Sequence, residues 1–224
     1  MILAHKIIEL LIKNNYQNTD WYNWRNINEN KLPNDILLPN GNQYFKNIAL
    51  KNQLHLKWTS ATDLEEKKDL IKYYIKDWGG IRGNSETSMT EYTTQTAEIL
   101  IQNGIKGIAS WSKALVVHNP KIYAIYDARV SVSINCIQYI FNTDKILLYP
   151  ILPSQNKLIK QANSHIKNIS NNANWNQLDN DNFYQNEYLP LLNSVAIELK
   201  SDISTIEMFL FAKAEEMARE AFHL

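Results

Sequence analysis

The stretch NGIKGIASWSKALVVHNPKIYAIYDARVSVSIN, residues 103–135, decides the fold that this sequence predicts. Its Asn-Gly pair at 103–104 is a typical stop for a preceding helix. A short apolar helix is expected from about Ser110 to His118, and Pro120 then interrupts the helical pattern. A second helix is expected from Asp127 to about Phe141. The sequence therefore predicts two helices joined by a connector, with Asp127 opening the second.

Helical periodicity extends to most of the remaining chain. Apolar residues recur at helical spacing in the first segment and in the last, and no internal repeat is present. The stretch TDKILLYPIL (143–152) is ambiguous, but its prolines argue against a central strand. We therefore expect an all-α protein that forms one domain over residues 1–224. Further helices are predicted over residues 1–13, 43–58, 63–78, 86–102, 154–169, 181–200 and 204–222.

The composition is that of a globular chain without strong charge. Apolar residues make up 45%, and 23 Lys and Arg balance 23 Asp and Glu. This balance argues against a strongly electrostatic nucleic-acid binder, although it leaves a local basic patch open. No apolar run is long enough to span a membrane. The first segment is better explained as an amphipathic helix than as a signal peptide, so a cytoplasmic location is expected.

Cysteine and histidine give no indication of a metal site. The single cysteine, Cys136, lies in an apolar helical pattern and is expected to be a buried structural thiol. The five histidines do not follow any metal-ligand spacing. No metal ion or cofactor is therefore expected.

Asp127 has two interpretations. As the first residue of a helix it can cap unpaired backbone N–H groups, which explains its position without any function. Its neighbours Ile125, Tyr126, Ala128 and Val130 are mostly apolar. A carboxylate in such surroundings can also stabilise a developing cation or activate water.

Two glycine-containing turns are candidates for phosphate binding. The turn from Gly104 to Gly107 precedes a helix, whose first N–H groups can hold an anion. The segment GGIRGN at 79–84 has three glycines around Arg82 and can form a loop that contacts DNA. For both segments the simpler explanation is an ordinary turn between helices. Arg129 is expected either to pair with a carboxylate or to contact a phosphate.

The pattern Gly107-Ile108-Ala109-Ser110-Trp111, followed by a helix, a Pro-containing loop and Asp127-Ala-Arg-Val, resembles the helix-hairpin-helix DNA glycosylase superfamily. The resemblance covers about 30 residues and implies two helical lobes flanking a cleft. The hairpin lobe would span about residues 60–142, and the N- and C-terminal helices would form the second lobe. It implies that Asp127 is the catalytic carboxylate and that the turn with Gly104, Lys106 and Gly107 contacts DNA, and Arg82 and Arg129 are further candidate DNA contacts. Ala109 stands where the family has a second glycine.

Within this resemblance Trp111 occupies the position that is Lys in the branch that also cleaves the strand. A shift of two residues would instead place Lys113 there as the Schiff-base amine, whereas an ordinary lysine at that position would be a solvated surface residue. Side chains two residues apart on a helix face nearly opposite sides, so Trp111 and Lys113 cannot both face Asp127. We favour Trp111, which implies a monofunctional enzyme. Trp111 and Tyr126, and also Trp78, are candidates to stack on a flipped base, with plain core packing as the alternative.

The sequence thus predicts a monomeric, monofunctional DNA glycosylase that leaves an abasic site. A hypermodified base in foreign DNA, and hence a role in antiviral defence, is an extension of this hypothesis. The alternative is a non-catalytic helical module that binds nucleic acid or protein. An RNA-acting toxin or ribonuclease is a third hypothesis, but the sequence has no His/Glu/Arg constellation at a spacing that indicates one.

Overall fold

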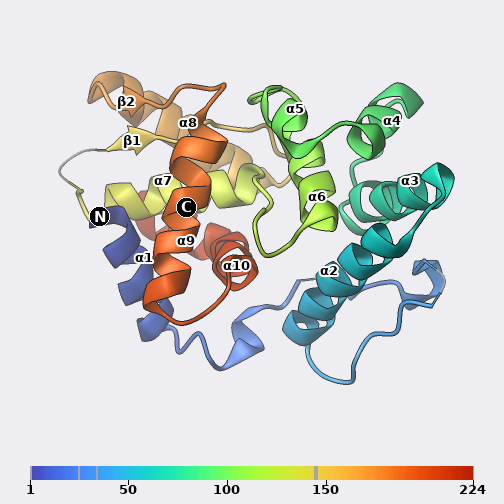
Figure 1. The fold of residues 1–224 in the computed structure, drawn as a ribbon. Helices are drawn as coiled ribbons and strands as arrows, with labels where there is room; N and C mark the ends of the chain where they lie inside the picture. The colour runs from blue at the N-terminus through green and yellow to red at the C-terminus, as the bar shows by residue number, and fades with distance from the viewer. Residues whose placement is uncertain (1, 25, 34, 144–145, 224) are drawn as a thin grey trace. The chain divides into compact units, whose positions relative to one another are not determined.

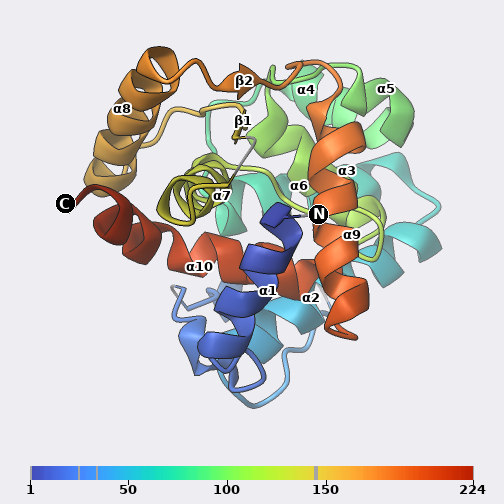
Figure 2. The ribbon, with the colours of Figure 1, turned by 90° about the vertical axis from the view of Figure 1, so that its left-hand side faces the viewer.

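A computed structural model describes residues 2–24, 26–33, 35–143 and 146–223. This part of the chain is mostly helical, with ten α-helices, and the predicted all-α class is confirmed (Figures 1 and 2). No helix among the described residues is long and apolar enough to cross a membrane.

The chain divides into two compact units. Unit 1 consists of residues 1–21 and 126–224, and unit 2 of residues 22–125. The predicted hairpin lobe, about 60–142, extends across this division. The helix that carries Trp111 therefore belongs to unit 2, whereas the helix that Asp127 opens belongs to unit 1.

Unit 2 is built around α6 (Ile108–His118), in which every position from Ser110 to Val117 is buried. A helix that is buried on all sides must have neighbours on all sides. Its neighbours are α2 (Gln43–Ser60), α3 (Leu64–Lys72), the π-helix η3 (Tyr73–Trp78), α4 (Glu86–Thr94) and α5 (Ala97–Ile101). An irregular segment with the short 3-10 helix η2 (Glu29–Lys31) precedes α2.

The predicted helix over residues 86–102 is wrong, because the chain forms α4 and α5 with a break between them. Gln95 is extended, with φ −83° and ψ 151°, and Thr96 is the N-cap residue of α5. The hydroxyls of Thr93 and Thr94 donate to the carbonyls of Met89 and Thr90, one turn back. Because β-branched threonines that bond the backbone in this way weaken a helix, the run of threonines is a natural place for it to end.

The predicted helix over residues 63–78 is confirmed, but its last part is a π-helix rather than an α-helix. It begins at Leu64 as an α-helix and continues from Tyr73 as a π-helix, which has more residues per turn. The face predicted to be buried comprised Leu64, Ile71, Tyr74, Ile75 and Trp78. Leu64 is 46% exposed, whereas three consecutive residues of the π-helix, Tyr73 to Ile75, are buried. Ile71, Tyr74 and Ile75 are thus buried as predicted, and Tyr73 is buried in addition.

Unit 1 is built around α7 (Ala128–Ile140), which is buried continuously from Val130 to Gln138. Helix α10 (Ile203–Phe222) packs along α7 (Figure 2). The other elements of unit 1 are α1 (Ile2–Lys13), the 3-10 helix η1 (Thr19–Trp21), α8 (Lys157–Asn172), the π-helix η4 (Tyr184–Tyr188) and α9 (Leu189–Glu198). The helices predicted in this unit are confirmed, and Met1 lies outside the described residues.

Polar side chains of α7 fix the segment that follows it. The amide of Asn135 donates to the carbonyl of Tyr149 at 3.0 Å and accepts from the Tyr149 N–H at 3.0 Å. Gln138 makes the same pair of bonds with Leu147, at 2.8 and 2.9 Å. The two side-chain amides thus provide hydrogen-bond partners for the backbone N–H and carbonyl groups of Leu147 and Tyr149, which would be costly to bury without partners. They hold the ambiguous stretch, of which residues 144–145 lie outside the described residues.

That stretch contains a short strand. Strand β1 (Leu147–Leu148) pairs in parallel with β2 (Asn176–Gln177), with Leu147 opposite Asn176. Two residues per strand are too few to form a sheet of independent stability. The pairing therefore leaves the all-α class unchanged.

Candidate active site

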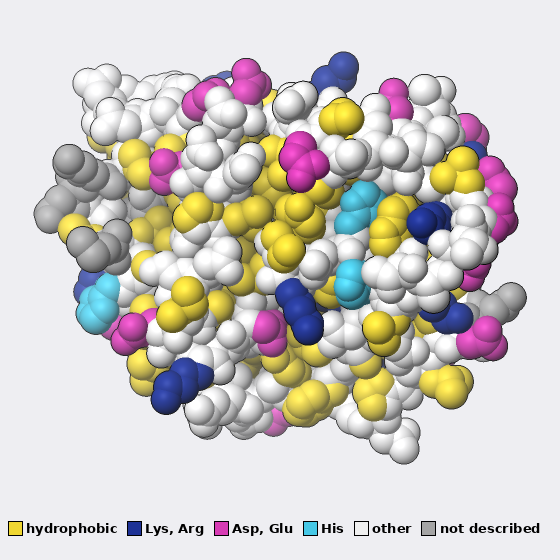
Figure 3. Space-filling view, viewed as in Figure 1, with side chains coloured by type: hydrophobic (Ala, Val, Ile, Leu, Met, Phe, Trp, Pro, Cys, Tyr) yellow, Lys and Arg dark blue, Asp and Glu magenta, His cyan; other side chains and the backbone are white. Residues whose placement is uncertain are grey.

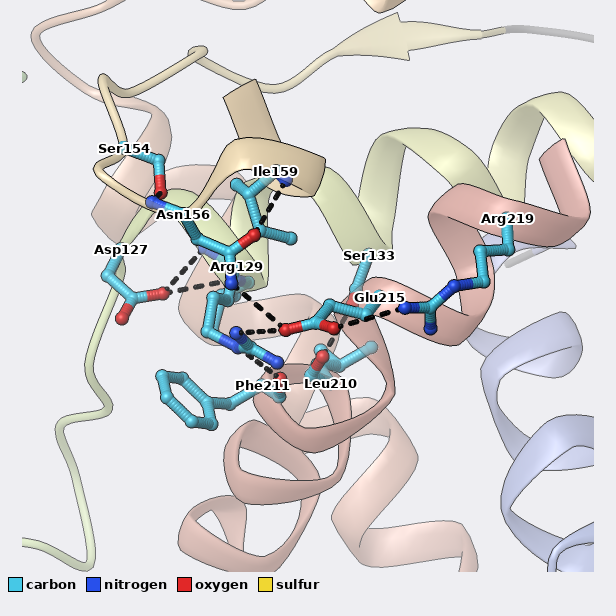
Figure 4. A network of polar contacts seen from close by, with 11 residues as sticks. Asp127, Arg129, Ser133, Ser154, Asn156, Ile159, Leu210, Phe211, Glu215 and Arg219 are labelled. Carbon is cyan, nitrogen blue, oxygen red and sulfur yellow. Dashed lines mark hydrogen bonds and ion pairs between the residues drawn. The ribbon is translucent and has the colours of Figure 1, made fainter. Parts of the chain in front are cut away.

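Asp127 is the N-cap residue of α7. It is extended, with φ −136° and ψ −177°, and its Oδ1 accepts hydrogen bonds from the N–H groups of Arg129 at 2.9 Å and Val130 at 3.1 Å. The predicted capping role is thus confirmed. Its second oxygen, Oδ2, accepts no hydrogen bond from the residues that the structure describes, and the side chain is partly exposed (Figure 4).

This geometry suits a reactive carboxylate. The two N–H groups fix the orientation of the carboxylate at the positive end of the helix dipole. The bonds use one oxygen, so the other can face a substrate or a water molecule. The arrangement has the chemistry of a general base or of a group that stabilises a cation.

Tyr126, the predicted base-stacking residue beside Asp127, is a core residue. Its side chain is fully buried, and its hydroxyl donates to the carbonyl of Pro150 at 2.8 Å. Its ring packs edge-on against Phe183 and Tyr188, with centroids 4.8 and 5.0 Å apart. Burial raises the pKa of its hydroxyl well above the usual value. These contacts favour a structural role for Tyr126 in the core over a role in stacking on a base.

Arg129 is paired with a carboxylate, which was one of its two predicted roles. Its Nη1 lies 3.0 Å from Glu215 Oε1, its Nε donates to the carbonyl of Phe211, and its guanidinium lies over the Phe211 ring (Figure 4). The side chain is 14% exposed. These contacts tie the start of α7 to α10. A phosphate contact by Arg129 remains a prediction.

The Glu215 carboxylate interacts with three donor side chains of unit 1. Besides Arg129, the amide of Asn156, the N-cap residue of α8, donates to it at 3.1 Å, and Arg219 Nη2 lies 3.5 Å away. Partial burial raises the pKa of this carboxyl, but the bond and charge of Arg129 outweigh that effect, so the net pKa is lowered. The cluster joins α7, α8 and α10 next to the Asp127 cap (Figure 4).

A buried carboxyl group lies in the core of unit 1. Glu207 is 3% exposed, near the start of α10. Burial, and then the charge of Glu207, raise the pKa of the buried Tyr188, and Asp127 contributes to the same shift. Both carboxylates therefore raise the pKa of the Tyr188 hydroxyl. No local sequence pattern indicated Glu215, whereas an acidic residue in a buried stretch of helix is itself a signal that could have identified Glu207.

In unit 2, Trp111 closes the predicted hairpin turn. Its Nε1 donates to the carbonyls of Gly104 at 3.2 Å and Lys106 at 3.1 Å. Gly104 and Gly107 have φ values of 55° and 70°, a left-handed conformation that glycine adopts without strain. The indole is fully buried, which favours the predicted alternative of core packing for Trp111. A stacking role would require the ring to be uncovered first.

The hairpin turn has the free donors expected of a phosphate-binding turn. Ser110 and Trp111 donate their N–H groups to the carbonyl of Gly107, whereas the N–H groups of Gly107 and Ala109 meet no acceptor among the described residues. Lys106 in the same turn is exposed. The turn can therefore offer two amides and one ammonium group to an anion.

The loop that carries Arg82 is tied to the same helix. Asn84 donates to the hydroxyl of Ser110 at 2.9 Å, and it accepts from the hydroxyl of Tyr92 at 3.5 Å. A Cβ on Gly107 would lie 3.2 Å from that same Tyr92 hydroxyl. Ser110 and Tyr92 thus connect the exposed Arg82 loop with the hairpin turn. No local sequence pattern indicated that these two residues connect the loop with the turn.

Lys113 is not a surface residue. Its side chain is 4% exposed, and its Nζ donates to the carbonyl of Ala109, one turn earlier in α6, at 2.7 Å. Gly79 packs against it, because a Cβ at that position would lie 2.9 Å from Lys113 Cε. The prediction of a solvated lysine is therefore wrong. Burial of the amine against the glycine turn gives it a packing role.

The surface gives no strong electrostatic indication. On the face shown in Figure 3, Lys and Arg side chains are scattered among Asp and Glu rather than gathered in one area. No three His, Cys, Asp or Glu side chains among the described residues are placed to hold a metal ion. Comparisons with protein-family models, with curated proteins and with solved structures gave no match to this chain.

Proposed function

We propose that this protein is a monofunctional DNA N-glycosylase in which Asp127 is the catalytic carboxylate. The observation that carries the proposal is the geometry of Asp127, which has one oxygen fixed by two N–H groups and a second oxygen without a donor among the described residues. The resemblance of the hairpin pattern to the helix-hairpin-helix glycosylases agrees with this assignment.

The chemistry follows from the charge on the sugar. When the N-glycosidic bond breaks, the base leaves with the bonding electrons and positive charge develops on the sugar ring. The Asp127 carboxylate would offset this charge and would accept hydrogen bonding from the attacking water through Oδ2. The water adds to the anomeric carbon and loses a proton to Asp127, the departing base takes up a proton, and an abasic site remains.

Two further features support the details of the proposal. The free N–H groups of Gly107 and Ala109, with the exposed Lys106 and Arg82, are suited to DNA phosphates. The amine of Lys113 donates a hydrogen bond to the Ala109 carbonyl inside the protein. This contact supports hydrolysis by water rather than attack on the sugar by an active-site amine. Tyr126 and Trp111 are left out of the proposed base pocket because both are core residues.

The proposal is tested by incubating the purified protein with duplex and single-stranded oligonucleotides. The panel should carry alkylated, oxidised and deaminated bases and hypermodified cytosines, and abasic sites are detected by cleavage with alkali. We expect abasic sites with at least one of these bases. A folded protein that releases none of them contradicts the proposal.

The second candidate is a non-catalytic helical module that binds nucleic acid or protein. The observation in its favour is that two of the three aromatic residues predicted to receive a base, Trp111 and Tyr126, are packed in the interior. In that case Asp127 serves only as a cap. A binding function that survives Asp127→Asn, in a protein without base release, would favour this candidate.

A further inference from the structure

Unit 2 contains a pocket of about 170 Å³ that the proposed function does not use. The irregular segment before α2 forms one wall with Trp24, Asn26 and Lys31, and the π-helix η3 forms the other with Tyr73, Asp77 and Trp78. Pockets for drug-sized molecules span roughly 300–1,000 Å³, so this one suits a single small ring system.

The aromatic part of the pocket is fixed in place. Trp78 stacks on Tyr74, with centroids 4.3 Å apart and an interplanar angle of 17°, and its Nε1 donates to Asn47 at 2.8 Å. The stack and the hydrogen bond hold the indole in one orientation before any ligand arrives. Trp24 and Trp78 are both partly exposed, and Tyr73 is buried. A planar ring entering here would meet preorganised aromatic surfaces.

The polar part of the pocket offers a donor and an acceptor side by side. Lys31 Nζ lies 2.8 Å from Asp77 Oδ1, and both side chains remain more than one-third exposed. Such an exposed pair contributes little to stability, so its groups can turn to a ligand at low cost. Asn26 accepts a bond from Gln43 at 2.8 Å through its carbonyl oxygen, which leaves its amide N–H₂ as a further donor.

From these observations we infer that the pocket binds a pyrimidine base with an amino group and a carbonyl group, that is, a cytosine-type base. The ring lies against the tryptophans, the carboxylate of Asp77 accepts from the exocyclic amino group, and Lys31 donates to the ring carbonyl. Uracil has a carbonyl where cytosine has the amino group, and Asp77 would repel it. The pocket consists of unit 2 residues alone, so the inference does not depend on the proposed glycosylase function.

The test is direct binding to the full chain, measured by saturation-transfer NMR and equilibrium dialysis. The probes are cytidine, uridine, cytidine 5′-monophosphate, a short oligo-dC, and ribose 5-phosphate as a ligand without a base. We expect cytidine to bind about tenfold more tightly than uridine and ribose 5-phosphate to show no binding. Tighter binding of oligo-dC than of the monophosphate would identify single-stranded nucleic acid as the source of the base, and equal binding would identify the free nucleotide.

Two variants and a matched control make the test specific. Trp24→Ala should weaken cytidine binding about tenfold, and Asp77→Asn should remove the preference for cytidine over uridine. Asp69→Asn, an exposed change in the neighbouring α3, should leave both unchanged. Circular dichroism confirms that each variant is folded. The inference is overturned if the folded wild-type protein binds no pyrimidine, if ribose 5-phosphate binds as well as cytidine, or if Trp24→Ala and Asp77→Asn both behave as the wild type does.

Discussion

The guanidinium of Arg129 in α7 and the carboxylate of Glu215 in α10 lie 3.0 Å apart, in a cluster that adjoins the cap of the candidate catalytic residue. Replacing Arg129 with Ala leaves the partly buried Glu215 with fewer donors and removes the bond from Arg129 Nε to the carbonyl of Phe211. We expect the free energy of unfolding to fall by about 1–3 kcal/mol, measured by urea denaturation. Arg219→Ala, which removes a longer and more exposed pair with the same carboxylate, is the matched control and should cost less than about 0.5 kcal/mol. Equal effects of the two changes would show that the cluster is not held by Arg129.

The contact between Gly79 and Lys113 predicts a contrast between two glycines of one loop. A Cβ on Gly79 would lie 2.7 Å from the carbonyl oxygen of Ile75 and 2.9 Å from Lys113 Cε, whereas a Cβ on Gly83 would meet nothing within 4 Å. Gly79→Ala should therefore destabilise the protein by about 1–3 kcal/mol. Gly83→Ala should be within about 0.5 kcal/mol of the wild type. Thermal unfolding of the two variants, side by side, checks the contrast, and a stable Gly79→Ala protein would contradict the packing of the lysine.

The burial of His118 predicts a loss of stability in mild acid. Burial, with smaller effects of Lys67 and His55, lowers its pKa to about 4, although a contact with the carbonyl of Tyr92 acts in the opposite sense. Between pH 6.5 and 4 the unfolded chain therefore binds more protons at this site than the folded one, so stability falls as the pH is lowered through this range. From pH 7 to pH 5 we expect a loss on the order of 1–2 kcal/mol.

His118→Gln removes the titrating group and keeps a side chain that can bond the Tyr92 carbonyl. Its stability should change less than that of the wild type between pH 7 and pH 5, measured by urea denaturation at each pH. Parallel pH profiles for the two proteins would show that another group causes the acid sensitivity.

The position of Lys113 predicts the absence of a covalent intermediate. Because its amine is buried and donates to the carbonyl of Ala109, it is not available to attack a sugar. Borohydride added during the reaction with a substrate oligonucleotide should therefore trap no protein–DNA adduct. A trapped adduct that disappears in Lys113→Ala would replace the monofunctional mechanism with one that uses this amine.

Local patterns predicted the helices well where the signals were strong. The cap at Asp127 was predicted from one carboxylate before an apolar run, and α1 and α10 from their apolar stripes. The break between α4 and α5 was missed because no Gly or Pro marks it, and its cause is a run of threonines that bond their own backbone. The π-helix at Tyr73–Trp78 was missed because a change in the number of residues per turn leaves no simple periodicity.

The candidate site was predictable only in part, because its parts meet through long-range packing. The pairing of Arg129 with Glu215 joins residues 86 positions apart, and no local pattern indicates that partner. The burial of Lys113 depends on a glycine turn more than thirty residues earlier in the chain, and the core roles of Trp111 and Tyr126 depend on which ring faces are covered. The pocket at Trp24 and Trp78 also required the tertiary structure, because its walls come from an irregular segment and a π-helix.

The most direct test of the central claim is base release under single-turnover conditions by Asp127→Asn. Asparagine caps a helix about as well as aspartate, so the variant should stay folded, whereas it lacks the negative charge that the reaction needs. Asp202→Asn is the matched control, because Asp202 caps α10 in the same unit through its bond from the N–H of Thr205 at 2.7 Å. We predict that Asp127→Asn binds substrate DNA but releases base at least about a hundredfold more slowly, and that Asp202→Asn reacts as the wild type does. Release by Asp127→Asn at the wild-type rate would contradict the account.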